Sequence, residues 1–368
     1  MKKEHIKEIP VEAIRADMIL AKDVLTKEGF VLLARDTMLN DINCTQLRAK
    51  NIDFVHIRTY SIDENSSAID LTSENTIDGQ KTPINDRSHF KQFEDTYEKS
   101  KNMAKKHLVS ISEGGEVNLK TLTLLTKNII ETVKCKSDIF SFISVLRQAD
   151  DHIFTHSCNV ALLCSLFAHW LAFDEVEASS LIVAGMLHDI GKIKTPPEIL
   201  NKKGQLTTEE FDIMKQHTEE GFLILQKKGI PHEIKTAALM HHERIDGSGY
   251  PFGTKGAFIS RFAKIVAICD IYDAMVSSRI YREKHSPFDV IHTFENRVYG
   301  EVDTSYLLIF LQNIAYTYIG TWVYLSDGQP AEVVFVNQNR LSRPIVRLEN
   351  GNMIDLAYNK NLKIVSIV

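Results

Sequence analysis

Between about residues 90 and 318 the chain shows a helical pattern, in which apolar residues recur at three- and four-residue spacing and polar turns separate the segments. Some of these apolar faces carry a polar residue where a leucine would be expected. His156 lies in line with Val160 on one face, and His188 ends an apolar segment and directly precedes Asp189. A fold that buries such side chains must supply partners for them, and this requirement constrains the chain more than any other feature.

The same departure recurs at five later positions, which are His217, His241, His242, Asp270 and Asp273. One such residue alone is usually a hydrogen-bonded core residue or a helix cap. A buried charge without compensation, however, costs on the order of several kcal/mol, so many such groups in one helical region are expected to compensate one another. A metal centre that they share does this most directly.

The donor atoms of this set indicate the kind of metal. Imidazole nitrogens and carboxylate oxygens without a thiolate favour Fe, Mn, Co or Zn over softer ions. Because neighbouring residues on a helix point about 100° apart, His188 can contact one ion while the Asp189 carboxylate bridges to a second. Two ions roughly 3.5–4 Å apart polarise a phosphate and lower the pKa of a water between them. The pattern therefore predicts an enzyme that hydrolyses phosphodiesters.

The composition argues against several other classes of protein. The chain has 43 Lys and Arg against 48 Asp and Glu, a formal net charge of −5, so no global positive field favours a nucleic-acid polymer or an anionic membrane. No apolar stretch of about 18 residues occurs, and no apolar run follows the charged start of the chain, so neither a membrane span nor a signal peptide is expected. The five cysteines are scattered without a CxxC pair, which argues against disulfides. We expect a cytoplasmic protein.

The patterns divide the chain into four parts. Residues 1–60 alternate strand and helix signals and predict a small α/β domain, and residues 61–90, rich in Ser, Asp, Asn and Thr, predict a polar linker. Residues 91–318 form the helical region, in which Thr207 and Glu210 predict a capping box. Residues 319–368 contain short β-rich runs separated by turns such as Asp-Gly and Asn-Gly. The expected fold is mainly α, with a small N-terminal α/β domain and a C-terminal β-rich segment.

Several motifs of the helical region resemble those of a known family. His156, the pair His188-Asp189 and Asp270 match the H…HD…D pattern of the HD superfamily of metal-dependent phosphohydrolases. The stretches "HDIGK", "HHERIDGSGYP" and "ICDIYDAM" are similar, in this order, to those of the HD-GYP family, which Gly249-Tyr250-Pro251 helps to name. The resemblance covers roughly residues 136–315. It implies a helical HD-type bundle and a cyclic di-GMP phosphodiesterase that produces pGpG and, with a second cut, GMP.

The resemblance also implies a centre of two or three divalent ions, with iron or manganese expected. The ligands of one ion would be His156, His188, Asp189 and Asp270, and those of the second His217, His241 and His242, with Asp189 as the bridge. Some members of the family have a glutamate four residues before the first histidine, which helps to hold a third ion. This chain has His152 at that position, where it could itself be a ligand.

Further residues are implied to act on the substrate, a cyclic dinucleotide. Lys192 would lie beside the bridging hydroxide and the scissile phosphate. Arg279 and Arg282 would bind phosphate or guanine. One wall of the substrate site would be formed by Gly249, Tyr250 and Pro251. The family's usual Asp-Arg-Pro-Tyr-Arg stretch is Ser-Arg-Ile-Tyr-Arg in this chain, which keeps both arginines.

Two alternatives remain open at the level of the sequence. The substrate could be another cyclic dinucleotide such as 3′,3′-cGAMP, because the choice of base depends on loop shape. The chain could also be a signalling adaptor that binds the dinucleotide without turnover, although degenerate members of the family usually lack part of the HD or GYP motif and here every ligand position is filled. A homodimer and a signalling-protein partner are both consistent with the sequence.

Overall fold

The structure is a computed structural model of the 368-residue chain. It describes residues 4–14, 18–25, 31–33, 39, 43, 47–48, 52–60, 87–133, 139–140, 143, 152–226, 229–277, 286–298 and 300–367. Two compact units are present: one consists of Met1–Arg87, Tyr316–Val336 and Ile345–Val368, and the other of Ser88–Ala315 and Asn337–Pro344. The predicted domain boundaries after residues 60, 90 and 318 remain a prediction, and most of the predicted linker lies outside the described residues.

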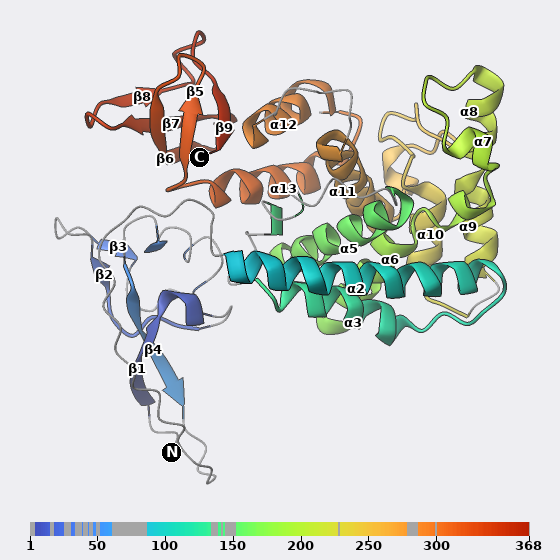
Figure 1. Ribbon diagram of the computed structural model, residues 1–368, viewed down its shortest axis with the longest axis horizontal. Coiled ribbons are helices and arrows are strands. Elements are labelled where there is room, and N and C mark those ends of the chain that lie inside the picture. The colour runs from blue at the N-terminus through green and yellow to red at the C-terminus, as the bar shows by residue number, and fades with distance from the viewer. Residues whose placement is uncertain are drawn as a thin grey trace. The chain divides into compact units, whose positions relative to one another are not determined.

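The second unit is helical, and the predicted mainly α fold is confirmed (Figure 1). Its α-helices are α2 (Arg87–Ser112), α3 (Leu119–Ile130), α5 (His152–Trp170), α6 (Glu175–Leu187), α7 (Pro197–Leu200), α8 (Thr208–Lys215), α9 (His217–Gln226), α10 (His232–Met240), α11 (Arg261–Ser277), α12 (Pro287–Thr293) and α13 (Thr304–Thr317). Shorter turns are the 3-10 segments η2 (Ile190–Lys194) and η3 (Gly256–Phe258) and the π-helical η4 (Phe294–Val298). None of the described helices is both long and apolar enough to cross a membrane.

Helices α5 and α6 lie at the centre of this unit, where α3, α10 and α11 pack against them. The two helices approach each other closely at Gly185, where a Cβ would lie only 2.8 Å from Cys164 Sγ and 3.1 Å from the Val160 carbonyl oxygen. Only a glycine allows this spacing. The close approach brings the end of α6, with His188, beside His156 on α5.

A second close approach joins η2 to the start of α9. A Cβ on Gly191 would lie 1.9 Å from the His217 carbonyl oxygen and 2.6 Å from the Gly221 amide nitrogen, so a larger residue at this position would push the two segments apart. Because Gly191 follows Asp189 by two residues, the contact sets Asp189 beside His217. A main-chain packing requirement therefore helps to assemble the site.

Side-chain caps determine where two of the helices begin. The carboxylate of Asp174 accepts the N–H groups of Val176 at 2.9 Å and Glu177 at 2.8 Å, which starts α6. The predicted capping box is confirmed at α8, where the Thr207 hydroxyl accepts from Glu210 N at 3.3 Å and the Glu210 carboxylate accepts from Thr207 N at 2.8 Å. A cap of this kind stabilises a helix by about 1 kcal/mol.

The N-terminal part of the first unit contains two small antiparallel sheets. Strand β1 (Glu4–Pro10) pairs with β4 (Phe54–Tyr60), and β2 (Val24–Leu25) pairs with β3 (Val31–Leu33). Residues 43, 47 and 48 are helical, so this part combines strands and helix as predicted. Its core is formed by buried apolar residues, which include Ile9, Val11, Leu20, Leu39, Leu47, Val55 and Ile57.

The C-terminal segment folds as a five-stranded sheet in the order β8-β7-β6-β5-β9. Its strands are β5 (Trp322–Leu325), β6 (Pro330–Asn337), β7 (Arg340–Leu348), β8 (Met353–Asp355) and β9 (Ile364–Ile367). Two predicted turns contain glycines with positive φ, Gly328 at 84° and Gly351 at 85°, a conformation that glycine adopts without strain. The predicted β-rich segment is thus confirmed, and the pairing of β9 with β5 adds a contact between residues distant in sequence.

Candidate metal centre

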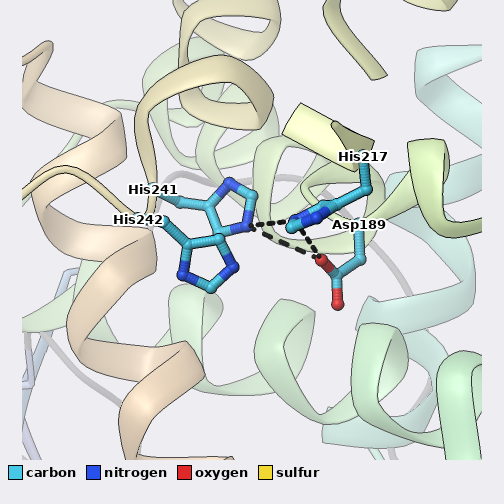
Figure 2. A group of neighbouring side chains, drawn as sticks. All are labelled: Asp189, His217, His241 and His242. Atoms are coloured by element: carbon cyan, nitrogen blue, oxygen red, sulfur yellow. Dashed lines mark hydrogen bonds and ion pairs between the residues drawn. The ribbon is translucent and has the colours of Figure 1, made fainter. Parts of the chain in front are cut away.

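The polar residues on the apolar helix faces meet in two adjoining groups. The first ligand group consists of His156, His188 and Asp270, and the second ligand group of Asp189, His217, His241 and His242. Within each group every residue offers one nitrogen or oxygen atom, and these atoms lie within 4.8 Å of one another. Figure 2 shows the second ligand group, in which the rings of His217 and His241 and the carboxylate of Asp189 point toward one another. No thiolate belongs to either group.

Most of these ligands come from helix ends. His188 is the C-terminal cap of α6 and His241 that of α10, while His217 is the first residue of α9. His156 and Asp270, in contrast, lie within α5 and α11. Helix ends suit this role because their unpaired carbonyl groups can hold an imidazole ring.

Hydrogen bonds to the main chain determine which nitrogen of three rings carries the proton. Nδ1 of His188 lies 2.7 Å from the Gly185 carbonyl oxygen, and Nδ1 of His217 lies 2.6 Å from that of Met214. Nδ1 of His241 lies 3.0 Å from the Ala238 carbonyl oxygen. A carbonyl oxygen can only accept a hydrogen bond, so each Nδ1 donates, and each neutral ring presents the lone pair of Nε2 to the centre.

These Nε2 atoms converge. Nε2 of His188 is 3.3 Å from Nε2 of His156, and Nε2 of His217 is 3.4 Å from Nε2 of His241. In the second pair both rings are neutral and present lone pairs to each other, an unfavourable arrangement that a cation between them relieves. Outer hydrogen bonds that orient ligand histidines in this way are typical of metal sites.

Asp189 lies between the two ligand groups. Its Oδ2 is 3.3 Å from His188 Nε2 and 3.6 Å from His156 Nε2, while its Oδ1 is 3.3 Å from His217 Nε2 and 3.6 Å from His241 Nε2. Within the described part of the chain, the buried Oδ1 accepts no hydrogen bond. A buried carboxylate oxygen without a donor, surrounded by imidazole nitrogens, fits a metal ion. The cluster is therefore able to hold metal ions.

The carboxylates are held ionised at this centre. Burial alone would raise the pKa of Asp189, but His188 and Lys192 outweigh burial and hold that pKa well below its usual value. Burial is likewise outweighed at Asp270, whose pKa is lowered mainly by its hydrogen bond with His156. The centre thus contains two ionised carboxylates at neutral pH, which a cation site requires.

The histidines differ from one another. Burial lowers the pKa of His217 to about 3 and also lowers that of His241 and His242. Burial acts in the same direction on His156, but there Asp270 and Asp273 outweigh it and raise the pKa to about 10. The rings of the second ligand group are therefore neutral at pH 7, whereas His156 is protonated when no cation is bound.

The loop after α10 covers the second ligand group. The ring of Tyr250 stacks on that of His242, with 4.7 Å between centroids and 26° between planes, and Tyr250 N donates to the His242 carbonyl oxygen at 3.2 Å. A Cβ on Gly249 would lie 2.4 Å from that same carbonyl oxygen, so only glycine permits the return of the chain. Phe211 meets the edge of the Tyr250 ring at 6.2 Å. An aromatic wall therefore adjoins the candidate metal centre.

Comparisons with known proteins agree with this geometry. Residues 141–300 match the model of the HD domain family. A cyclic di-GMP phosphodiesterase of Pseudomonas aeruginosa is 32% identical over 204 residues, which are 55% of this chain and 49% of that protein. A cyclic di-GMP phosphodiesterase of Thermotoga maritima is 41% identical over 168 residues, 44% of this chain and 45% of that protein.

The helical region therefore contains an HD domain and is similar to these two cyclic di-GMP phosphodiesterases. A further relative, a 3′3′-cGAMP-specific phosphodiesterase of Vibrio cholerae, is 35% identical over 171 residues, 46% of this chain and 40% of that protein. The chain spans about half the length, or less, of these curated relatives.

The structure brings together most of the HD-GYP residues predicted from the sequence. All seven predicted ligands belong to one of the two ligand groups. Lys192 places its Nζ 2.5 Å from Oδ2 of Asp189, and Tyr250 lies against His242. Arg279 and Arg282 lie outside the described residues, as does the side chain of His152, and Pro251 follows Tyr250 through a cis peptide bond.

Two residues of the HD domain have roles that the sequence pattern did not predict. The buried carboxylate of Glu243 accepts the N–H groups of Phe252 at 2.9 Å and Thr254 at 2.8 Å, and so holds the loop that carries Tyr250. Asp273 accepts a hydrogen bond from Nδ1 of His156 at 2.7 Å. A signal for Asp273 was present, because it follows Asp270 by one helical turn and therefore lies on the same face of α11.

Proposed function

We propose that this protein is a metal-dependent phosphodiesterase that hydrolyses cyclic di-GMP to pGpG and, with a second cut, to GMP. The observation that carries the proposal is the position of Asp189, whose two carboxylate oxygens face the two ligand groups. Such a carboxylate can bridge two ions. The proposal is also supported by the names of the relatives from Pseudomonas aeruginosa and Thermotoga maritima, both of which are cyclic di-GMP phosphodiesterases.

We propose two or three divalent ions, iron or manganese, held by the seven ligands of the two groups. When bound, they would polarise the scissile phosphate and lower the pKa of a water toward neutrality. The protein itself supplies the orientation of the rings through the Nδ1 hydrogen bonds, and it excludes water by burying His188, Asp189, His217 and His241 almost completely. These residues therefore form a preformed and largely buried site that would hold the ions.

Lys192 is proposed to assist at the phosphate. Burial lowers the pKa of its ammonium group, but Asp189 and Asp270 outweigh burial and raise the pKa above its usual value, so Lys192 is cationic at neutral pH. Its side chain is 23% exposed, and its Nζ lies 2.5 Å from the Asp189 carboxylate. A fixed positive charge beside the metal centre would stabilise negative charge that develops on the phosphate oxygens.

The substrate is proposed to lie against the aromatic wall. Tyr250 would contact a base or the ribose-phosphate ring, with Gly249 and Pro251 setting the shape of this wall. We also propose that Arg279 and Arg282 bind phosphate or guanine, because a guanidinium group can bind phosphate oxygens in pairs and can stack on a purine. These two residues follow α11, which carries Asp270.

A second substrate is also supported by a specific observation. The relative from Vibrio cholerae is named as specific for 3′3′-cGAMP and matches 46% of this chain at 35% identity. The two dinucleotides differ in one base only, so a guanine would be bound in either case. Hydrolysis of 3′3′-cGAMP is therefore the alternative function.

A turnover assay tests both proposed activities, hydrolysis of cyclic di-GMP and hydrolysis of 3′3′-cGAMP. The purified protein, loaded with Mn²⁺ or Fe²⁺ without oxygen, should convert cyclic di-GMP to pGpG faster than it converts 3′3′-cGAMP or cyclic di-AMP, as measured by chromatography of the products. Elemental analysis of the same sample should find two or more ions per chain. Fewer than one ion per chain, or loading without hydrolysis of any cyclic dinucleotide, would contradict the proposal. Faster hydrolysis of 3′3′-cGAMP would select the alternative.

A further inference from the structure

We infer that Tyr97 on α2 positions the metal ligand His156 through a buried chain of hydrogen bonds that runs through Asn159 and Asp273. The inference rests on the proposed metal centre, since it assigns a positioning role toward one of its ligands. Helix α2 itself contributes no member of either ligand group. The chain of hydrogen bonds is therefore a connection between the centre and a helix outside it.

Each step of this chain is a short contact between side chains. The Tyr97 hydroxyl donates to Oδ1 of Asn159 at 2.7 Å and approaches the Thr155 carbonyl oxygen at 3.3 Å. The Asn159 amide donates to Oδ1 of Asp273 at 2.9 Å, and Oδ2 of Asp273 accepts from Nδ1 of His156 at 2.7 Å. Nε2 of His156 is then left to face Asp270 Oδ1 at 3.0 Å. Four side chains from three helices thus share one ordered arrangement.

Burial makes this arrangement restrictive. Tyr97 is 1% exposed, Asn159 3% and Asp273 1%. A buried polar group that loses its partner is destabilised, because water does not replace the lost hydrogen bond. The Asn159 amide offers its oxygen to Tyr97 and its nitrogen to Asp273, so the orientation of the amide is determined at both ends. A displacement of the Tyr97 hydroxyl therefore changes the position of the Asp273 carboxylate, and with it the ring of His156.

The position of helix α2 should affect the hydrogen bonds of Tyr97. Helix α2 begins at Arg87, the last residue of the N-terminal stretch of the first unit, and continues into the helical unit. The bond from Tyr97 to Asn159 joins α2 to α5. A shift of α2 along α5 would move the tyrosine hydroxyl relative to Asn159. The strength of metal binding at His156 thus depends on where α2 lies.

Metal binding by the full-length protein provides the test. We compare wild type with Tyr97→Phe, which removes only the hydroxyl, and with Asn159→Ala, which removes the middle of the chain. Metal-free proteins are titrated with Mn²⁺ in a calorimeter, and their melting temperatures are recorded. Ser112→Ala is the matched control, because it also removes one hydroxyl hydrogen bond from α2, to the Val109 carbonyl oxygen at 2.7 Å, but does not belong to the chain.

Outer partners of metal-bound histidines typically contribute about 10–100-fold to metal affinity, so Asn159→Ala should weaken the affected site by that factor. Tyr97→Phe, one step further from the ligand, should weaken it about threefold to tenfold. The double variant should bind Mn²⁺ within about twofold of Asn159→Ala alone, because the tyrosine acts only through the asparagine. Ser112→Ala should bind like wild type. If Tyr97 and Asn159 had a purely structural role, both substitutions would lower the melting temperature, but the effect of Tyr97→Phe on Mn²⁺ affinity would not depend on whether Asn159 is present.

The outcomes separate the inference from the proposed function. Wild type that binds no Mn²⁺ would contradict the metal centre and, with it, the positioning role. Wild type that binds while Tyr97→Phe retains full affinity would overturn the positioning role alone. The positioning role would also be overturned if Tyr97→Phe and Asn159→Ala weakened Mn²⁺ binding independently of each other.

Discussion

The two ligand groups use the same residue types but differ in charge. In the first ligand group, His156 faces the carboxylates of Asp270 and Asp273, and the balance of burial and charge raises its pKa to about 10. In the second ligand group, His217 is buried beside His241, and its pKa falls to about 3. The difference follows from the number of carboxylates that each ring contacts. Burial lowers the pKa of both rings, and neighbouring carboxylates outweigh burial only at His156.

This difference has consequences for metal binding. A cation that enters the first ligand group must replace a proton on His156, whereas one that enters the second meets neutral rings with free lone pairs. Asp189 belongs to both sites, because its two oxygens face the two groups. The groups should therefore respond separately to substitutions of histidines and jointly to a substitution of Asp189.

The largest effect is expected for Asp189→Ala. It removes the carboxylate that both ligand groups share, so hydrolysis should fall below detection and metal content should fall below one ion per chain, measured by product chromatography and elemental analysis. Asp212→Ala is the control, since Asp212 is an exposed aspartate of the same unit, paired only with Lys215 among the described residues. Wild-type turnover by Asp189→Ala would show that the shared carboxylate is not a bridge.

Substitutions in one group at a time should separate the two sites. We expect His156→Ala and His217→Ala each to lose about one ion per chain and to retain the other. Each should reduce kcat by more than the about 10–100-fold that loss of an outer-shell partner causes, because a direct ligand is removed. Elemental analysis with kcat of the same preparations checks this. Loss of all ions in both variants would mean that the two groups form one inseparable site.

The metal-free protein should show the contrast in its pH dependence. The pKa of His156 is raised above the unfolded value of about 6.5, so its contribution to stability is complete below that pH and is lost as pH rises toward about 10. The pKa of His217 is lowered to about 3, so stability is lost instead as pH falls below about 6.5. Melting temperatures of chelator-treated protein should therefore fall on both sides of neutrality.

Single substitutions test which histidine causes the loss of stability at alkaline pH and which causes the loss at acidic pH. His156→Asn should flatten the alkaline decline and leave the acidic one, and His217→Asn should reduce the acidic decline. The slopes are compared, because each substitution also changes stability by a constant amount. An unchanged alkaline slope in His156→Asn would refute the assignment of the raised pKa to that ring.

The smallest effect is expected for Glu243→Gln, which leaves both ligand groups untouched. The carboxylate holds two loop N–H groups, and the amide can accept in their place only through its single oxygen. Replacing charge-assisted bonds by neutral ones costs about 1 kcal/mol, which corresponds to a rise in KM of roughly fivefold with unchanged metal content. The control is Glu233→Gln at an exposed position of α10. Loss of metal from Glu243→Gln would show that the loop supports the ligands themselves.

Local patterns were sufficient to predict much of this protein. The capping box at Thr207 and the glycine turns at Gly328 and Gly351 depend on a few neighbouring residues, and the structure confirms them. The histidines on apolar faces were recognisable because helical periodicity determines which residues share a face. Their convergence required one further assumption, that buried polar groups compensate one another. The structure places all seven predicted residues in the two ligand groups, and their role as metal ligands stays a prediction.

Other features depended on contacts between residues distant in sequence. Glu243 follows the two histidines and would be expected to lie in solvent, but the returning loop buries it and supplies two N–H donors. The partner of Asp273 is His156, 117 residues earlier, and no local pattern indicates that pair. The position of the Asp189 carboxylate between the two ligand groups likewise depends on the close approach of η2 to α9 at Gly191.

The sequence by itself determined the kinds of donor atom, the helices that carry them and the caps that begin those helices, because these properties depend on residue type and on spacing along one element. Only the tertiary structure decided which imidazole is protonated, which carboxylate is shared and which helix outside the centre contacts it. The physical reason is that a pKa and the orientation of a side chain depend on charges and donors within a few ångströms, and most of these come from elements far apart in the chain.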